Sequence, residues 1–477
     1  MNTLSVIWLG DATSNKGEHV MSPHEALMPA NSEKFMGDQL HRLDMRKGKF
    51  SRGAFYASAA GYFMSPSPAA AWTMASVNAY YRAESKTKIS DKCIYNQLDK
   101  YEALPGAELV VKQMLKGLER QLRRKVKIYA RRCGDPAALC RRMGVSGIVI
   151  CDGCEAPVIP SVLSDTEGLG NECYGKSRPK ADGSAPRPAI KLHVAYSLVR
   201  RCFVYVAVTG ACGSERDMVP CDLMKDQNVL FVMDRGYCGE DLEKSITDSG
   251  NQFLIRDRGN RKAEIVGCVK DGAPVKEPPA DTSKAQGGLF DCTVKRKSDG
   301  AQVREIIARN GEKDMSLRTS LSCTALAAEA AGPLYRLRWQ IELFNKCLKS
   351  GSGLRAINSG KVRIILQFVM ICLMACILKT WLMMTAQSRA KEDCDISALK
   401  TCIKIGKLYA DLTKAIATKG RTTVWARAEE MIETIINECV RTRPGKRDRR
   451  EGRDLRLQTE AVLKSGPQEI VNEIKVA

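Results

Sequence analysis

The sequence has few of the residues that build a zinc site or an extracellular disulfide scaffold. Its one C-x2-C pair, Cys151 and Cys154, has no histidine at a zinc-ligand spacing, because the chain holds only four: His19, His24, His41 and His193. The 19 cysteines are odd in number and scattered, and no secretory signal pattern precedes them. We therefore predict a reducing, cytoplasmic location, where most thiols are small core residues.

The sequence also lacks an apolar run long enough to suggest a membrane span. The longest candidate, residues 364–378, reads IILQFVMICLMACIL and ends at Lys379. It is shorter than the roughly 20 residues that a spanning helix needs. We expect a buried core helix and no membrane partner.

Positive charge is present in excess. The 477 residues include 75 Lys and Arg against 54 Asp and Glu, a formal net charge of +21 and a pI near 9.3. This balance is typical of proteins that bind a polyanion, and nucleic acid is the expected one. Because 44% of the residues are hydrophobic, most of the chain is packed globule rather than charged tail.

Residues 1–143 are predicted to form a mostly helical DNA-binding region. The first 70 or so show no clear periodicity, so helix is expected from about Ala70. In SDKCIYNQLDKYE, Ser90 or Asp91 caps a helix that places Ile94, Leu98 and Tyr101 on one face. This helix fits a helix-turn-helix unit or a plain bundle equally well. A further helix at 108–132 ends in a basic cluster, either a solvated face or a phosphate-contacting one.

An α/β core is predicted for residues 144–250 and 326–390. Four apolar runs read as its strands: GIVICDG, AIKLHVAYSL, CFVYVAVTG and VLFVMDRGY. A helix, DLEKSITDSG, follows the last run and is closed by Gly250. Residues 251–325 return to short strand-like pieces between Gly and Pro turns, which predicts a β-rich insert.

The remainder is predicted to be helical. Two long apolar helices are expected at 334–350 and 362–386, and a third at 397–417. Residues 391–477 form the predicted C-terminal region. It includes RTRPGKRDRREGRDLR, which is too charged to pack and is expected to be a mobile basic tail.

Two carboxylates follow predicted strands directly, Asp152 after GIVIC and Asp234 after VLFVM. Open α/β sheets expose functional side chains at the carboxyl ends of their strands. Strand ends carry Asp often enough that neither residue is convincing without a third partner.

The predicted helix 334–350 supplies such a partner. Four polar residues share one narrow stripe at 100° per residue: Tyr335, Arg338, Glu342 and Lys349. Leucine, isoleucine and phenylalanine form an apolar face beside it. An ordinary i,i+4 ion pair would explain Arg338 and Glu342 alone, but not the other two.

The segment PLYRLRWQIELFNKCLK resembles the Y-x2-R-x3-E-x6-K signature of DDE transposases of the insertion-sequence-four group. Further pieces are similar in the same order: KLHV at 191–194, VTG at 208–210, DRGY at 234–237 and FLIR at 253–256. The resemblance covers about residues 140–380. It implies a ribonuclease-H-like sheet with a β insert between the second Asp and the Glu.

The resemblance also implies the chemistry. Asp152, Asp234 and Glu342 would hold two Mg²⁺ ions, for which Mn²⁺ could substitute, and would support in-line attack on a DNA phosphodiester. Water attacks first and the freed 3′ hydroxyl second. Three further residues would hold DNA phosphates, Tyr335, Arg338 and Lys349. The implied partners are transposon ends and target DNA, with a homodimer in the synaptic complex, in association with the nucleoid.

Several alternatives stay open at this point. The family usually has a hydroxyl residue shortly after its first Asp, whereas this chain reads D-G-C, so Asp165 in S-D-T-E rivals Asp152. His193 could face the same site or simply be packed. The chain could also be a ribonuclease-H-like nuclease that does not join strands, a catalytically inactive DNA-binding relative, or a protein anchored in a membrane by residues 364–378.

Overall fold

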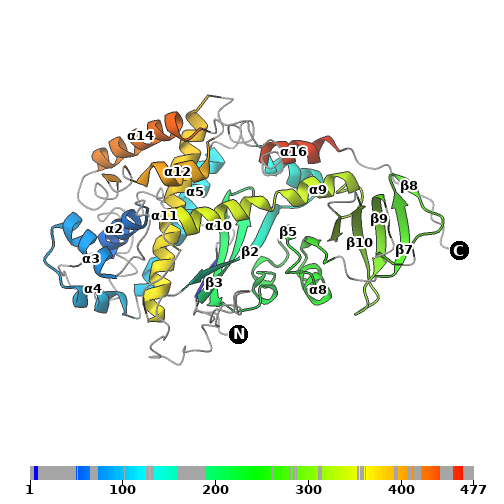
Figure 1. Cartoon of the computed structure of the whole chain (residues 1–477), viewed down its shortest axis with the longest axis horizontal. Helices are drawn as coiled ribbons and strands as arrows, with labels where there is room; N and C mark the ends of the chain where they lie inside the picture. Colours follow the sequence, from blue (N-terminus) through cyan, green and yellow to red (C-terminus); the bar gives the residue numbers. More distant parts are fainter. Residues whose placement is uncertain are drawn as a thin grey trace, which may run out of the picture.

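The computed structural model describes residues 5–8 and, with interruptions, residues 50–465. The longest stretches outside the description within 50–465 are 65–73, 158–188, 413–420 and 441–454. The molecule is elongated, with helices gathered at one end, a sheet in the middle and a second group of strands at the other end (Figure 1). The predicted α/β class is confirmed.

Five strands form the centre of the sheet, and their order confirms the predicted ribonuclease-H-like core. Strands β4, β3 and β2 pair antiparallel, and β5 and β6 continue the sheet in parallel with β2. Their bounds are β2 (Gly147–Pro157), β3 (Ala189–Ser197), β4 (Cys202–Gly210), β5 (Val229–Met233) and β6 (Gln252–Arg256). A short strand, β1 (Ser5–Trp8), pairs with β4 at the edge.

These strands are mostly apolar because both faces of the sheet are covered. On one face, Ile148 and Ile150 of β2 join a large core cluster that includes the helices. On the other face, Val149 and Cys151 join a second cluster that includes the helix α8 (Glu240–Asp248). Cys154 belongs to the first cluster. Cys151 and Cys154 therefore lie on opposite faces of β2 and cannot share a zinc ion.

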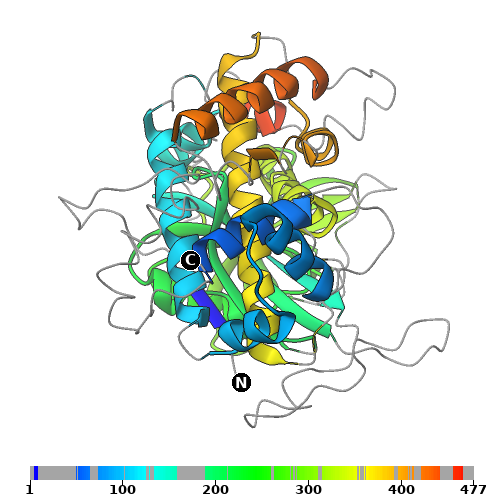
Figure 2. The same ribbon diagram turned by 90° about the vertical axis from the view of Figure 1, so that its left-hand side faces the viewer.

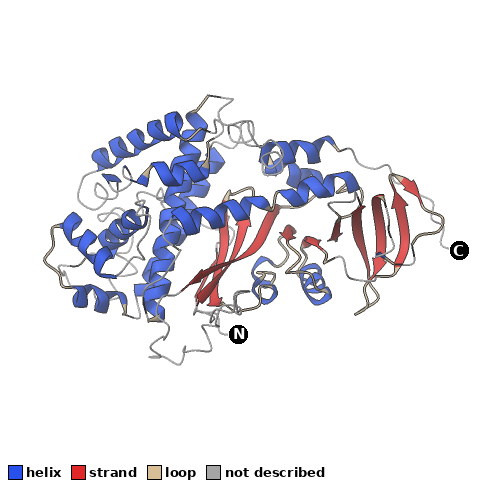
Figure 3. Cartoon of the chain, viewed as in Figure 1, coloured by secondary structure: helices blue, strands red, loops and turns tan. Residues whose placement is uncertain are grey.

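The sheet continues without a break into the second group of strands (Figure 3). β11 (Met315–Thr319) pairs with β6, and the next neighbours in order are β10 (Gln302–Arg309), β9 (Gly288–Lys295), β7 (Ile265–Lys270) and β8 (Ala273–Pro274). β6 thus stands at the start of the predicted insert and still pairs in parallel with β5 of the core. The domain boundaries at 251 and 325 stay a prediction.

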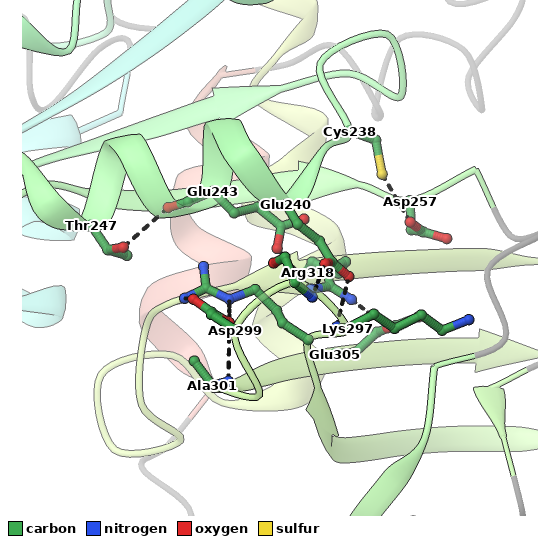
Figure 4. A network of polar contacts seen from close by, with 12 residues as sticks. Cys238, Glu240, Glu243, Thr247, Asp257, Lys297, Asp299, Ala301, Glu305 and Arg318 are labelled. Carbon is green, nitrogen blue, oxygen red and sulfur yellow. Dashed lines mark hydrogen bonds and ion pairs between the residues drawn. The ribbon is translucent and has the colours of Figure 1, made fainter.

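A buried ion network joins α8 to the strands beyond β6 (Figure 4). Arg318 of β11 is only 1% exposed and donates a 2.7 Å hydrogen bond to Glu243 of α8, which is fully buried. A second guanidinium nitrogen of Arg318 lies 3.6 Å from Glu305 of β10, also 1% exposed. Nearby, the Cys238 thiol donates to Asp257 at 2.9 Å.

Helix α11 (Val362–Arg389) stands between the sheet and the amino-terminal helices (Figures 1 and 2). It packs against α2, α5 and α14. The prediction that its apolar run is too short to span a membrane was wrong, because the helix continues ten residues past Lys379 and has the length and composition of a span. Its most apolar window is nevertheless 89% buried inside the structure, as expected of a core helix.

The amino-terminal helices are α2 (Arg52–Met64), α3 (Met74–Ser85), α4 (Asp91–Leu98) and α5 (Ala103–Arg124). Helix therefore begins well before Ala70. The sequence of α2 has no amphipathic period because the helix is buried on nearly all sides. In α4, Ser90 caps the amino end and Ile94 and Leu98 are buried, as predicted. Tyr101 and most of the basic cluster after Arg124 lie outside the described residues.

The remaining helices are α7 (Pro136–Met143), α9 (Ala328–Arg336), α10 (Trp339–Gly351), α12 (Ala398–Lys404), α14 (Arg421–Glu438) and α16 (Leu455–Lys464). The predicted charged tail, residues 441–456, shares only Leu455 and Arg456 with the helix α16, so its packing stays a prediction. α16 lies against α7 and α9 and buries Gln458, Thr459 and Val462. Residues 441–454 lie outside the described residues.

Candidate active site

The site is built on two neighbouring parallel strands. Ile150 of β2 lies opposite Val232 of β5, so the next residues on the same face, Asp152 and Asp234, stand at the same level. The pairing of β2 with β5 ends at Ile150 and Val232, so both acids lie just past the paired part of the two strands. Asp152 was expected at the end of its strand, but β2 continues to Pro157 in its pairing with β3, so Asp152 lies within the strand. Asp234 follows the last residue of β5, and its carboxylate accepts a 2.7 Å hydrogen bond from the Gly236 amide.

Helix α10 crosses the same face of β2 and brings Asn345 to Asp152. The Asn345 side-chain amide donates to the Asp152 carboxylate at 2.9 Å. The preceding residue, Phe344, packs against Tyr196 and Phe203 of β3 and β4, with ring centroids 5.6 and 5.8 Å apart. The packing of Phe344 on the sheet therefore determines which residue of α10 reaches Asp152.

The predicted single helix 334–350 is in fact two helices, α9 and α10, joined by a tight turn. Leu337 and Arg338 donate backbone hydrogen bonds three residues back instead of four. Hydrophobic periodicity misses such a turn because it changes the direction of the stripe without adding a polar segment. Tyr335 therefore lies in α9, whereas Glu342 and Lys349 lie in α10.

The turn still leaves the predicted polar residues in contact. The Arg338 guanidinium forms an ion pair with Glu342 and lies 5.9 Å from the centre of the Tyr335 ring. Two turns along α10, the Lys349 ammonium lies near the thiol of Cys154, two residues beyond Asp152 on the same face. Burial raises the pKa of Cys154 to about 11, and Lys349 opposes that rise.

Negative charge is concentrated around Asp152. Burial raises the pKa of Asp152 to about 6, and the nearby Arg338 opposes that rise. Three more carboxylates add to the rise, those of Asp234, Glu215 and Glu342. Three acids thus lie close enough to Asp152 to disfavour its charged form, and a bound cation would relieve this repulsion.

The sequence prediction missed two of the residues found here, Glu215 and Asn345. Glu215 lies in the polar loop after β4, where its carboxylate forms an ion pair with Lys191 at 3.4 Å. No periodic pattern surrounds it. Asn345 stands inside the signature segment, three residues after Glu342, but at a position that the Y-x2-R-x3-E-x6-K signature does not define.

His193 does not contact the acids directly in this structure. It lies opposite Gly153 in the β2–β3 pair, and its Nε2 is 2.7 Å from the Thr209 hydroxyl. Burial, helped by the charge of Lys191, lowers its pKa to about 4. It is a packed histidine. The rival first acid, Asp165, lies outside the described residues, so the choice of Asp152 stays a prediction.

The donors at the site suit a hard divalent cation. They are carboxylates, and the Asn345 Oδ1 adds a buried oxygen that has no hydrogen-bond partner among the described residues. As the side chains stand, no three His, Cys, Asp or Glu residues in the described part of the chain are arranged to hold an ion. Arg338 pairs with Glu342, and Asn345 with Asp152. The oxygen donors therefore suit a metal ion, but their side chains would have to rotate to bind it.

Comparisons with known proteins agree with this reading. A search of curated proteins found no match to the chain. Residues 152–378 match the family model described as the transposase DDE domain. The match begins at Asp152 and includes Asp234, Glu342 and the helix α10. This part of the chain is therefore similar to a transposase DDE domain.

Proposed function

We propose that the chain is a transposase of the insertion-sequence-four group that cleaves transposon ends and transfers the strands to target DNA. The observation that carries this proposal is that Asp152 and Asp234 lie on neighbouring parallel strands and that Glu342 lies on the helix that hydrogen-bonds to Asp152. Two elements far apart in sequence, β2 and α10, supply the first and third acids. One acid in β2, one directly after β5 and one on the crossing helix α10 suit phosphodiester chemistry better than DNA binding alone.

In the proposed site, Asp152, Asp234 and Glu342 hold Mg²⁺ or Mn²⁺. Two such ions would activate the attacking oxygen and stabilise the leaving oxygen of the phosphodiester. Asn345 orients the Asp152 carboxylate by its 2.9 Å hydrogen bond. Arg338, released from Glu342, is free to bind a DNA phosphate with two parallel hydrogen bonds, and the Tyr335 ring stacks on its guanidinium.

Lys349 is proposed as a second phosphate contact. Its ammonium, at present near the Cys154 thiol, lies beyond Asp152 along β2 and acts as a point charge. We further propose a homodimer in the synaptic complex, because two transposon ends must be held together. A cytoplasmic, nucleoid-associated location and the absence of a membrane partner belong to the same proposal.

Conservative substitution of each acid tests the function. Asp152→Asn, Asp234→Asn and Glu342→Gln are each expected to lower cleavage of a transposon-end DNA by about 10³-fold or more, since each loss removes several kcal/mol of charge stabilisation. DNA binding should persist. Asp241→Asn, at an exposed position of α8, is the matched control. Unchanged cleavage in the Asp152 variant would refute the assignment.

A second assay separates the alternative activities. A pre-cleaved end that carries a 3′ hydroxyl should be joined to target DNA by the wild-type chain and not by the Asp234 variant. A chain that cleaves but never joins would be a nuclease. A chain that binds DNA with no cleavage in Mg²⁺ or Mn²⁺ would be an inactive relative.

A further inference from the structure

Glu215 lies against the backbone that follows Asp152 and Asp234. A Cβ atom built on Gly153, the residue after Asp152, would stand 2.5 Å from the Glu215 Oε1. A Cβ on Gly236, two residues after Asp234, would stand 3.8 Å from its Oε2. The Glu215 carboxyl group therefore occupies the space left by the absent side chain at Gly153 and extends toward Asp234.

The loop that carries Glu215 is fastened at both strand ends. Lys191 of β3 is 3.4 Å from Glu215 and donates a 3.1 Å hydrogen bond to the Gly213 carbonyl. Arg216 donates a 3.2 Å hydrogen bond to the Gly236 carbonyl. The Lys191 side chain is 9% exposed and that of Glu215 is 31% exposed. The Lys191 ammonium is thus nearly buried, whereas the Glu215 carboxylate is partly exposed to solvent.

We propose that Glu215 is a fourth carboxylate of the metal site, where it strengthens the binding of the divalent cations held by Asp152 and Asp234. This inference rests on the function proposed above. A hard, partly exposed oxygen on the side of Asp234 is the kind of ligand that Mg²⁺ and Mn²⁺ prefer. Lys191 holds Glu215 in place and at the same time competes for its charge.

The inference also accounts for the D-G-C departure from the family pattern. A serine at 153 would put its Cβ where the Glu215 carboxylate now lies. The carboxylate is the flexible end of a side chain, so it would move away without disrupting the fold. In this chain, the glycine at 153 leaves space for the Glu215 carboxylate.

Mn²⁺ binding to the full chain without DNA, measured by calorimetry, tests the proposal. Glu215→Gln should weaken Mn²⁺ binding by about 10-fold or more. Lys191→Met should leave the affinity unchanged or tighter, because it removes the competing cation and keeps the acid. Asp217→Asn, two residues away and exposed, should behave as the wild type. Gly153→Ser should weaken binding as Glu215→Gln does, because it displaces the carboxylate.

The outcomes separate the two proposals. Wild-type Mn²⁺ affinity in the Glu215→Gln and Gly153→Ser chains, with weakened affinity in Asp152→Asn, would overturn the role of Glu215 and leave the proposed function intact. Wild-type affinity in Asp152→Asn would instead contradict the proposed metal site. Equal losses of thermal stability in Glu215→Gln and Lys191→Met, with no change in Mn²⁺ affinity, would show a purely structural ion pair.

Discussion

Asn345 is the residue that ties Asp152 to α10. Asn345→Leu keeps the approximate volume of the side chain and removes its hydrogen bond to Asp152. We expect DNA cleavage to fall by about 10 to 100-fold, the usual loss when a residue that orients a metal ligand is removed. The Mn²⁺ concentration needed for half-maximal cleavage should rise, which a purely structural defect would not cause. Lys346→Ala, at the exposed neighbouring position, is the control. Equal activity in the two variants would refute this role.

His193 makes the stability of the fold depend on pH. Its pKa is about 4 when folded and about 6.5 when unfolded, so unfolding takes up a proton between these values. Its contribution to stability is therefore full above about pH 6.5 and falls as the pH is lowered toward 4. Asp152, whose pKa is raised when folded, acts in the opposite direction.

A comparison with His193→Gln isolates this effect, because glutamine can still hydrogen-bond to Thr209 and does not titrate. From about pH 7 to pH 5, the wild-type chain should lose about 2 kcal/mol more unfolding free energy than the variant. Urea denaturation at each pH measures the difference. Parallel pH profiles for the two chains would contradict the prediction.

At the scale of single residues, the sequence offers candidates where the chemistry follows a local pattern. Asp152 and Asp234 follow apolar strands, and Glu342 lies in a dense signature, so the sequence alone pointed to them. Glu215 and Asn345 could not be found in this way. Glu215 occupies space left by Gly153, which is 62 residues earlier in the chain. Asn345 reaches the site through a hydrogen bond to Asp152, which is 193 positions earlier.

Among the elements, α10 depends on Phe344 for its position on the sheet. Phe344→Ala should lower the free energy of unfolding by about 3 kcal/mol, because it leaves a cavity beside Tyr196 and Phe203. Leu343→Ala, at the half-buried neighbouring position, should cost about 1 kcal/mol. Urea denaturation of both variants provides the comparison. Equal losses would show that Phe344 does not anchor the helix.

Helices were predicted best where one face is polar, and strands where a short apolar run is bounded by turn residues. The amphipathic helix α4 and the core strands were found, whereas α2 was missed because it is buried nearly all round. The turn between α9 and α10 was missed for another reason. Three-residue hydrogen bonds over Leu337 and Arg338 redirect the helix while the apolar spacing continues almost unchanged.

For the whole molecule, the network around Arg318 tests how firmly the strands beyond β6 are attached to the core. Glu243→Gln leaves the buried guanidinium short of one negative partner and should cost about 3 to 5 kcal/mol of unfolding free energy. Replacing Arg318, Glu243 and Glu305 together by Met, Leu and Leu should cost less, because no unpaired charge remains. Thermal or urea unfolding measures both. A larger loss in the triple variant would contradict this account.

The unbroken sheet has a mechanical consequence. Because β11 is hydrogen-bonded to β6, and β6 to β5, the strands beyond the core are continuous with the strand that ends at Asp234. They cannot swing like a lid on a flexible tether. Any DNA bound by β7 to β10 would lie at a fixed distance from the acids. This half of the sheet would therefore set the position of the cut along a bound duplex.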